Sequence, residues 1–111
     1  MASIGEIYTV EIFFDDDPSK SKLRPVLIIN AENNIYTFAE ITSTPPKVPP
    51  TYFDRFKKPI QDWQKAGLLN ASYVKTHKLH RSGEDKLVKY RGKIEGEELI
   101  AILTRIVEVN Y

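Results

Sequence analysis

The stretch Ser19-Lys20-Ser21-Lys22-Leu23-Arg24-Pro25-Val26-Leu27-Ile28-Ile29 does most to set the fold. A polar segment leads into an Arg-Pro pair, and four apolar residues follow at once. An uninterrupted apolar run of this length is typical of a strand that is buried on both faces. Pro25 restricts Arg24 to an extended conformation, so we expect the guanidinium to be held at the edge of that strand.

The residues on either side of this stretch predict antiparallel neighbours. Positions 7–14 alternate with the period of two that marks a strand with one buried face. The polar segment 15–23, which contains Pro18, is expected to be a long loop. Residues 30–34 have the composition of a turn, and 35–41 are expected to form the next strand, which completes a hairpin.

The second half of the chain begins with a proline-rich segment that interrupts the series of strands. Five of the seven prolines fall between Pro45 and Pro59, which argues against a central strand there. Basic and aromatic residues interleave in the same segment: Lys47, Tyr52, Phe53, Arg55, Phe56, Lys57 and Lys58. Residues 61–66 could form a short helix that Gly67 ends.

The remaining residues predict two strands and a terminal helix. Segments 72–79 and 87–94 look like strands that are joined by a turn around Ser82-Gly83. Apolar residues then recur at helical spacing at Leu99, Ile100, Leu103, Ile106 and Val107. We therefore expect one domain over residues 1–111, mainly β, with a small antiparallel barrel capped by a C-terminal helix.

Composition excludes several classes of site. The chain has no cysteine, so disulfides and thiolate metal sites are ruled out, which suits a reducing, cytoplasmic environment. Neither a secretory signal nor an apolar run of roughly 20 residues is present, so no membrane role is expected. His77 and His80 are only three residues apart with no acid beside them, so we predict no metal site and no cofactor.

Net charge is +1, but its distribution is uneven. Seven basic residues lie between Lys75 and Lys93 against only Glu84 and Asp85. Such a stretch can follow the phosphates of a nucleic acid. The solvated face of a hairpin explains the same charge pattern equally well.

Several motifs, in order along the chain, resemble the MazF/PemK toxins, and the PemK-like branch in particular. Gly5-Glu6-Ile7-Tyr8 and then Lys22–Ile29 resemble the family's first two strands. Ile41-Thr42-Ser43 is similar to the step that ends its third strand. Further similarities are found in Ala66-Gly67-Leu68, Ser72-Tyr73-Val74-Lys75 and Ile94-Glu95-Gly96-Glu97-Glu98-Leu99.

This resemblance implies an SH3-like barrel and a homodimeric, metal-independent endoribonuclease that a cognate antitoxin neutralises. Single-stranded RNA would be cut to 2′,3′-cyclic phosphate and 5′-hydroxyl ends. The family's catalytic Arg and Thr correspond to Arg24 and Thr42, with Ser43 as the adjacent hydroxyl. A fixed positive charge and hydroxyl donors suit a reaction in which charge develops on phosphate oxygens. The candidates for contacting RNA are Lys20, Lys22, Lys75, His77 and Lys78.

One departure from the family affects the proton chemistry. Some relatives carry an acid where this chain has Ser72, so the general base is unassigned, with His77, His80 and Glu40 as candidates. Two alternatives stay open. One is a non-catalytic small-barrel module that binds RNA or a peptide. The other is a gyrase-poisoning toxin like CcdB, although that branch generally relies on residues after its helix, and here the apolar helix comes just before Tyr111.

Overall fold

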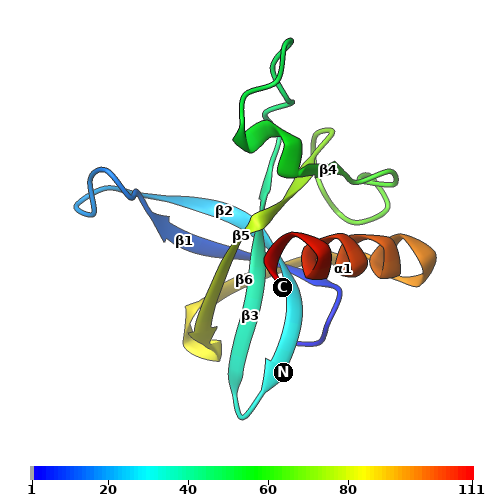
Figure 1. The fold of residues 1–111 in the computed structure, drawn as a ribbon. Coiled ribbons are helices and arrows are strands. Elements are labelled where there is room, and N and C mark those ends of the chain that lie inside the picture. The colour runs from blue at the N-terminus through cyan, green and yellow to red at the C-terminus, as the bar shows by residue number, and fades with distance from the viewer. Residues whose placement is uncertain (1) are drawn as a thin grey trace.

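The computed structural model describes residues 2–111 as one antiparallel sheet with a helix beside it (Figure 1). The strand order is β4-β5-β3-β2-β1-β6. The elements are β1 (Glu6–Phe13), β2 (Ser21–Glu32), β3 (Ile35–Thr42), the 3-10 helix η1 (Phe53–Phe56), β4 (Lys57–Pro59), β5 (Tyr73–Gly83), the 3-10 helix η2 (Glu84–Lys86), β6 (Leu87–Lys93) and α1 (Gly96–Asn110). The predicted class, mainly β with a C-terminal helix, is confirmed.

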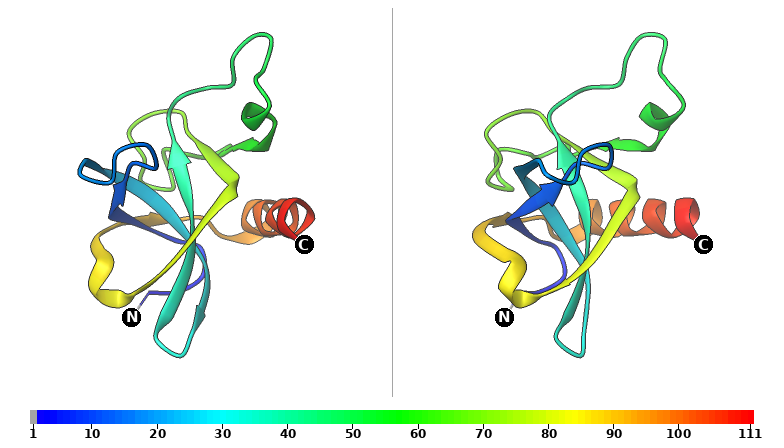
Figure 2. Two further views of the ribbon diagram at one scale, coloured as in Figure 1. Left: turned by 60° about the vertical axis from the view of Figure 1, so that its left-hand side comes forward. Right: turned by 90° about the vertical axis from the view of Figure 1, so that its left-hand side faces the viewer.

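The expected closure into a barrel is wrong, because the sheet stays open. Within residues 2–111, β6 pairs with β1 alone and β4 pairs with β5 alone. Strands β5 and β6 leave η2 in different directions (Figure 2). Side chains of both strands, among them Arg81 and Val88, line a pocket of about 550 Å³.

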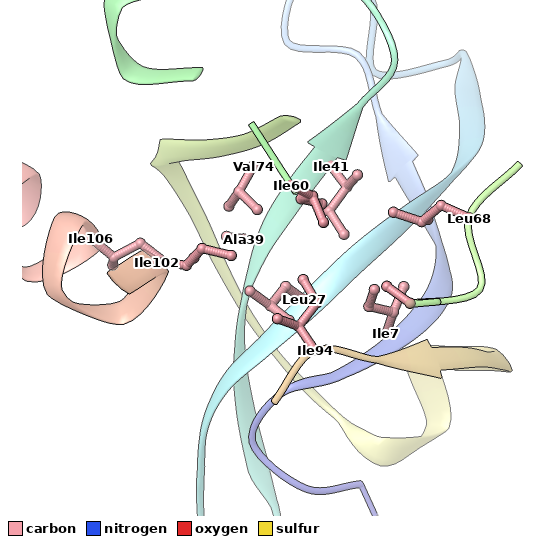
Figure 3. Packing of buried hydrophobic residues seen from close by; sticks show 11 residues of the cluster. Ile7, Leu27, Ala39, Ile41, Ile60, Leu68, Val74, Ile94, Ile102 and Ile106 are labelled. Atoms are coloured by element: carbon pink, nitrogen blue, oxygen red, sulfur yellow. The ribbon is translucent and has the colours of Figure 1, made fainter. Parts of the chain in front are cut away.

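The apolar run in β2 divides its side chains between two cores, as expected of a strand buried on both faces. Val26 and Ile28 pack with Phe38 on one face of the sheet. Leu27 points to the other face (Figure 3). There it joins a cluster that includes Ile7, Ala39, Ile41, Ile60, Val74 and, from α1, Ile102 and Ile106. The helix therefore packs against one face of the sheet through Ile102 and Ile106. In the described residues no helix is long and apolar enough to span a bilayer.

Strand β2 is longer than its apolar run and already begins at Ser21. Its first residues pair with β1 as a two-stranded ribbon, in which Ser21 lies opposite Phe13. Phe13 and Leu23 are both more than half exposed. This ribbon therefore lacks the buried face whose alternation of apolar and polar residues would have predicted a strand. The expected loop 15–23 is thereby reduced to residues 14–20.

The helix expected at 61–66 is replaced by hydrogen-bonded turns. The Ala66 N–H donates to the Asp62 carbonyl and the Leu68 N–H to the Trp63 carbonyl, each at 3.0 Å. Gly67 then adopts a φ of +89°, which stops the turns before a regular helix can develop. The helix prediction was wrong, whereas the position of the stop was right.

The one strand in the proline-rich segment is β4, a three-residue edge strand that ends at Pro59, so the argument against a central strand holds. The turn expected around Ser82-Gly83 lies just beyond those residues, in η2.

Candidate active site

The β2–β3 pairing brings Arg24 and Thr42 together. Val26 lies opposite Glu40 and Leu27 opposite Ala39. Extending this antiparallel register by two residues puts Arg24 opposite Thr42. Alternation along each strand places both side chains on the face of the sheet that carries Val26 and Ile28, away from α1.

Arg24 has a free guanidinium in this position. Among residues 2–111, no ion pair or side-chain hydrogen bond engages it, although the side chain is half-buried. Thr42 is almost fully buried, and its Oγ1 accepts the Thr44 N–H at 3.1 Å. That bond uses an acceptor position, so the Thr42 hydroxyl can still donate its own hydrogen.

Arg24 and Thr42 form the boundary between two pockets. The larger pocket is about 500 Å³ and the smaller about 200 Å³. Besides these two residues, the larger is lined by Asp15, Thr44, Phe53, Asp54, Lys57, Lys75, His77 and Lys78. The smaller is lined by Lys22, Leu23, Pro25, Ile41, Ser43, Leu68, Leu69, Asn70, Ser72 and Arg91. A chain molecule that passes from one pocket to the other would cross Arg24 and Thr42.

A buried carboxylate lies next to this boundary. Glu40 Oε2 is 2.6 Å from His80 Nε2, and Glu40 Oε1 is 3.8 Å from Lys75 Nζ. Burial raises the pKa of Glu40, but the hydrogen bond from His80 and the charge of Lys75 outweigh burial, so that its pKa is lowered overall. Glu40 is therefore ionised at neutral pH and forms an ion pair with Lys75.

Strand β5 supplies one wall of the larger pocket. Val74 joins the core beneath α1, so the alternating Lys75 and His77 face the opposite side, where Arg24 lies. Burial, followed by the charges of Lys75 and Lys78, lowers the pKa of His77. The imidazole is accordingly neutral at pH 7. Its ring packs against Phe53 and Phe56, with centroids 5.3 and 4.9 Å away.

Asp54 holds the opposite wall, the segment between β3 and β4, in place. Its Oδ2 accepts the backbone N–H groups of Lys47 and Thr51 at 3.0 and 2.9 Å. Its Oδ1 is 3.1 Å from Lys57 Nζ, which also donates to the Thr44 carbonyl. The two backbone donors hold the pKa of Asp54 far below its usual range. Sequence reasoning missed this residue, although the spacing Thr51-x-x-Asp54 resembles half of a capping box and could have indicated it.

The structure gathers most of the residues singled out from the sequence. Arg24, Thr42, Lys75, His77 and Lys78 line the larger pocket, and Lys22 and Ser43 the smaller one. Lys20 is the exception, because its ammonium is well exposed, lies 3.9 Å from Asp17 and lines neither pocket. The bases between Lys75 and Lys93 do not form one track either, since Lys93 lines a pocket beside α1. In residues 2–111, His, Asp and Glu side chains form no group of three that could hold a metal ion.

Comparisons with known proteins agree with this fold. A family model described as PemK-like, MazF-like toxin of type II toxin-antitoxin system matches residues 3–109. A mycobacterial endoribonuclease solved with its cognate antitoxin superposes with a TM-score of 0.73 at 16% identity, covering 98% of this chain and 94% of that one. The Mycobacterium tuberculosis toxin MazF-mt6 gives 0.64 at 19% identity, with 96% and 99% covered. A search of curated protein sequences finds no match.

Proposed function

Since the chain belongs to the PemK-like, MazF-like toxins of type II toxin-antitoxin systems, we propose that it is a metal-independent endoribonuclease of the cytoplasm that a cognate antitoxin neutralises. The observation that carries the proposal is the free Arg24 guanidinium, opposite the Thr42 hydroxyl and between two pockets. Solved mycobacterial endoribonucleases of similar structure, one of them in complex with its antitoxin, support the substrate class and the partner.

The chemistry requires charge neutralisation and two proton transfers. The ribose 2′-oxygen forms a bond to the phosphorus as the bond from phosphorus to the next 5′-oxygen breaks. Arg24 would pair with the non-bridging oxygens through its two parallel N–H groups, and Thr42 would donate a hydrogen bond to the same phosphate. The products are a 2′,3′-cyclic phosphate and, once the departing oxygen has taken up a proton, a 5′-hydroxyl.

Two of the three candidate bases line pockets that Arg24 also lines. His77, a neutral imidazole, lines the larger pocket, and Glu40, a carboxylate, lines a separate one. His80 contacts Glu40 but lines the gap between β5 and β6, which Arg24 does not line. Ser72 supplies no carboxylate, and its hydroxyl donates to the Asn70 carbonyl at 2.7 Å. Rates of Glu40→Gln and His77→Asn, measured side by side, will show which group takes the 2′-proton.

The decisive experiment is incubation with a long single-stranded RNA in excess EDTA, followed by mass spectrometry of the product ends. We expect cleavage and cyclic phosphate termini. A strict requirement for magnesium would contradict the proposal. Tight RNA binding without any cleavage would instead support the non-catalytic binding module.

We also propose that the protein is a twofold symmetric homodimer, by analogy with the family and because large apolar side chains stay exposed. Val88 on β6 and Ile100 and Val107 on α1 are each more than half exposed. An isologous interface would cover such residues on both subunits. Light scattering at micromolar concentration should give about twice the chain mass of 12.8 kDa, and a monomer would contradict the proposal.

A further inference from the structure

The larger pocket contains an aromatic wall that the cleavage chemistry does not use. Phe53 belongs to η1 and is 61% exposed, although it lines the same pocket as Arg24 and Thr42. Its ring stacks on His77, with an interplanar angle of 18°. A large apolar ring that faces an open, cationic pocket is a poor core residue and a good contact for a flat ligand.

This wall is rigid before any ligand arrives. The Asp54 carboxylate, in the residue next to Phe53, ties η1 to the backbone of Lys47 and Thr51. On the other side, the fully buried Thr76 hydroxyl donates to the Phe56 carbonyl at 2.6 Å and fastens η1 to β5. A ring held from both sides loses little conformational entropy on binding. Figure 1 shows η1 beside β4, near the beginning of β5.

The chemistry of the pocket favours a nucleobase. Its volume of about 500 Å³ is in the range of small-ligand sites. Cationic Lys75 and Lys78 line the same pocket as Arg24 and Phe53, which suits a charged phosphate beside a neutral ring. His77 Nδ1 is buried without a hydrogen-bond partner in the described residues, so the wall has polar capacity that the protein does not use.

We infer that the larger pocket is a stacking subsite for one unpaired nucleobase adjacent to the phosphate at Arg24, with Phe53 as the platform and His77 supporting its ring from behind. The inference rests on the proposed function only in naming RNA as the ligand. Stacking on an aromatic ring tolerates any base, because every base has a π face. The subsite would therefore hold the strand in register for cleavage, and base preference would come from groups at the edge of the pocket.

The test is the affinity for a fluorescent, random-sequence RNA decamer with 2′-O-methyl riboses, measured by anisotropy. Such an RNA has no free 2′-hydroxyl and cannot be cut. Phe53→Leu keeps an apolar side chain but removes the ring, so we expect affinity to fall about 5- to 100-fold. Phe53→Trp should retain or raise it. The dependence of affinity on salt should be unchanged in Phe53→Leu, whereas Lys75→Met should lower its slope by about one.

Tyr90→Leu is the matched control. Tyr90 lies on β6 and is 48% exposed, but its ring packs against Tyr8 and it lines neither pocket of the site. Its substitution should change affinity by less than about twofold.

Unchanged affinity in Phe53→Leu would overturn the inference, and so would an equal loss in Tyr90→Leu, since that would indicate that any exposed aromatic ring contributes equally. If the wild type binds no oligomer at all, the inference also fails and a peptide side chain becomes the better occupant. If the wild type binds with the expected dependence on Phe53 but never cuts natural RNA, the subsite stands and the proposed ribonuclease function fails.

Discussion

Two segments flank the candidate site, and they are held in different ways. Residues 43–56, between β3 and β4, are fixed by the nearly buried Asp54 carboxylate and by the Thr76 hydroxyl. Residues 14–20, between β1 and β2, reach the site through one ion pair, in which Asp15 Oδ2 lies 2.5 Å from Lys78 Nζ. The Asp15 side chain is 83% exposed. Both segments stand at the same end of the sheet (Figure 2).

The difference indicates that the two segments have different roles around Arg24. Exposed ion pairs contribute little free energy, because water and salt screen them. A nearly buried carboxylate with two backbone donors is far harder to displace, since each donor would lose its partner. Residues 43–56 therefore form a fixed wall, and residues 14–20 form a wall that can open. Arg24 belongs to neither wall, because it lies in the regular part of β2 between them.

The largest effect is expected from Arg24, the group that both walls enclose. Arg24→Ala removes the charge that would pair with the phosphate, so the cleavage rate should fall about 10²-fold or more. The measurement is the initial rate of RNA cleavage in EDTA. Arg105→Ala is the matched control, since Arg105 lies on α1 in a largely exposed ion pair with Glu108. A loss of less than about threefold in Arg24→Ala would remove Arg24 from the mechanism.

The next effect is expected from breaking the fixed wall. Asp54→Asn keeps one oxygen for the two backbone donors but turns an amide NH2 toward the Lys57 ammonium, which loses its ion-pair partner. Phe53 and Thr44 would move relative to Arg24, and a displacement of about 1 Å can cost up to about 10²-fold in rate. We expect a 10- to 100-fold loss of cleavage with circular dichroism unchanged.

Limited proteolysis reports directly on the segment itself. In Asp54→Asn, cleavage by protease should become faster within residues 43–56. Asp85→Asn provides the control, because Asp85 occupies the other 3-10 helix, η2, and lines neither pocket of the site. Protease resistance equal to that of the wild type would show that Asp54 does not hold the wall.

The sequence revealed the core more readily than the walls. The run Val26–Ile29 and the alternation around Val74 both follow from the period of a strand, and this period also puts Lys75 and His77 on one face. Arg24 was singled out by the Arg-Pro pair and by family resemblance. Its position opposite Thr42 depends on the β2–β3 register. The sequence of residues 30–34 is compatible with more than one register, and the register is fixed only because Asn33 and Asn34 form the turn with positive φ.

The walls were harder to predict because single side chains organise them. Asp54 acts on backbone donors three and seven residues earlier, and such contacts leave no periodic pattern. The open edge of the sheet was missed for a related reason. Strand patterns report which face is buried, but not whether the first and last strands meet.

A smaller effect is expected from pH, because the carboxylates of the two walls should take up their protons at different pH values. The pKa of Asp54 is lowered mainly by backbone N–H donors, and the pKa of Asp15 by its hydrogen bond to the exposed Lys78. A carboxylate with a lowered pKa stabilises the fold above its unfolded value near 3.8, and this stabilisation is lost as the pH falls through its folded value. As the pH falls, Asp15 should therefore take up its proton before Asp54 does.

Carboxyl chemical shifts in 13C-labelled protein, titrated from pH 6 downwards, will give both midpoints. Release of residues 14–20 should accompany protonation of Asp15, while residues 43–56 stay ordered. If the two carboxyls titrate together, the proposed difference between the walls is wrong.

The smallest effect is expected from Asp15→Asn, which removes only the ion pair of the movable wall. Asp15 and Lys78 both line the larger pocket. In the wild type the Asp15 carboxylate therefore forms an ion pair with an ammonium that RNA would otherwise contact. Without it, affinity for the 2′-O-methyl decamer should rise a few-fold, and the melting temperature should change little, because the pair is exposed. Asp16→Asn makes the same charge change in an exposed neighbour and controls for general electrostatic attraction. An equal rise in both variants would mean that charge alone, and not release of Lys78, explains the gain. A loss of affinity in Asp15→Asn would show that the pair positions Lys78 for RNA, and residues 14–20 would then belong with the fixed wall.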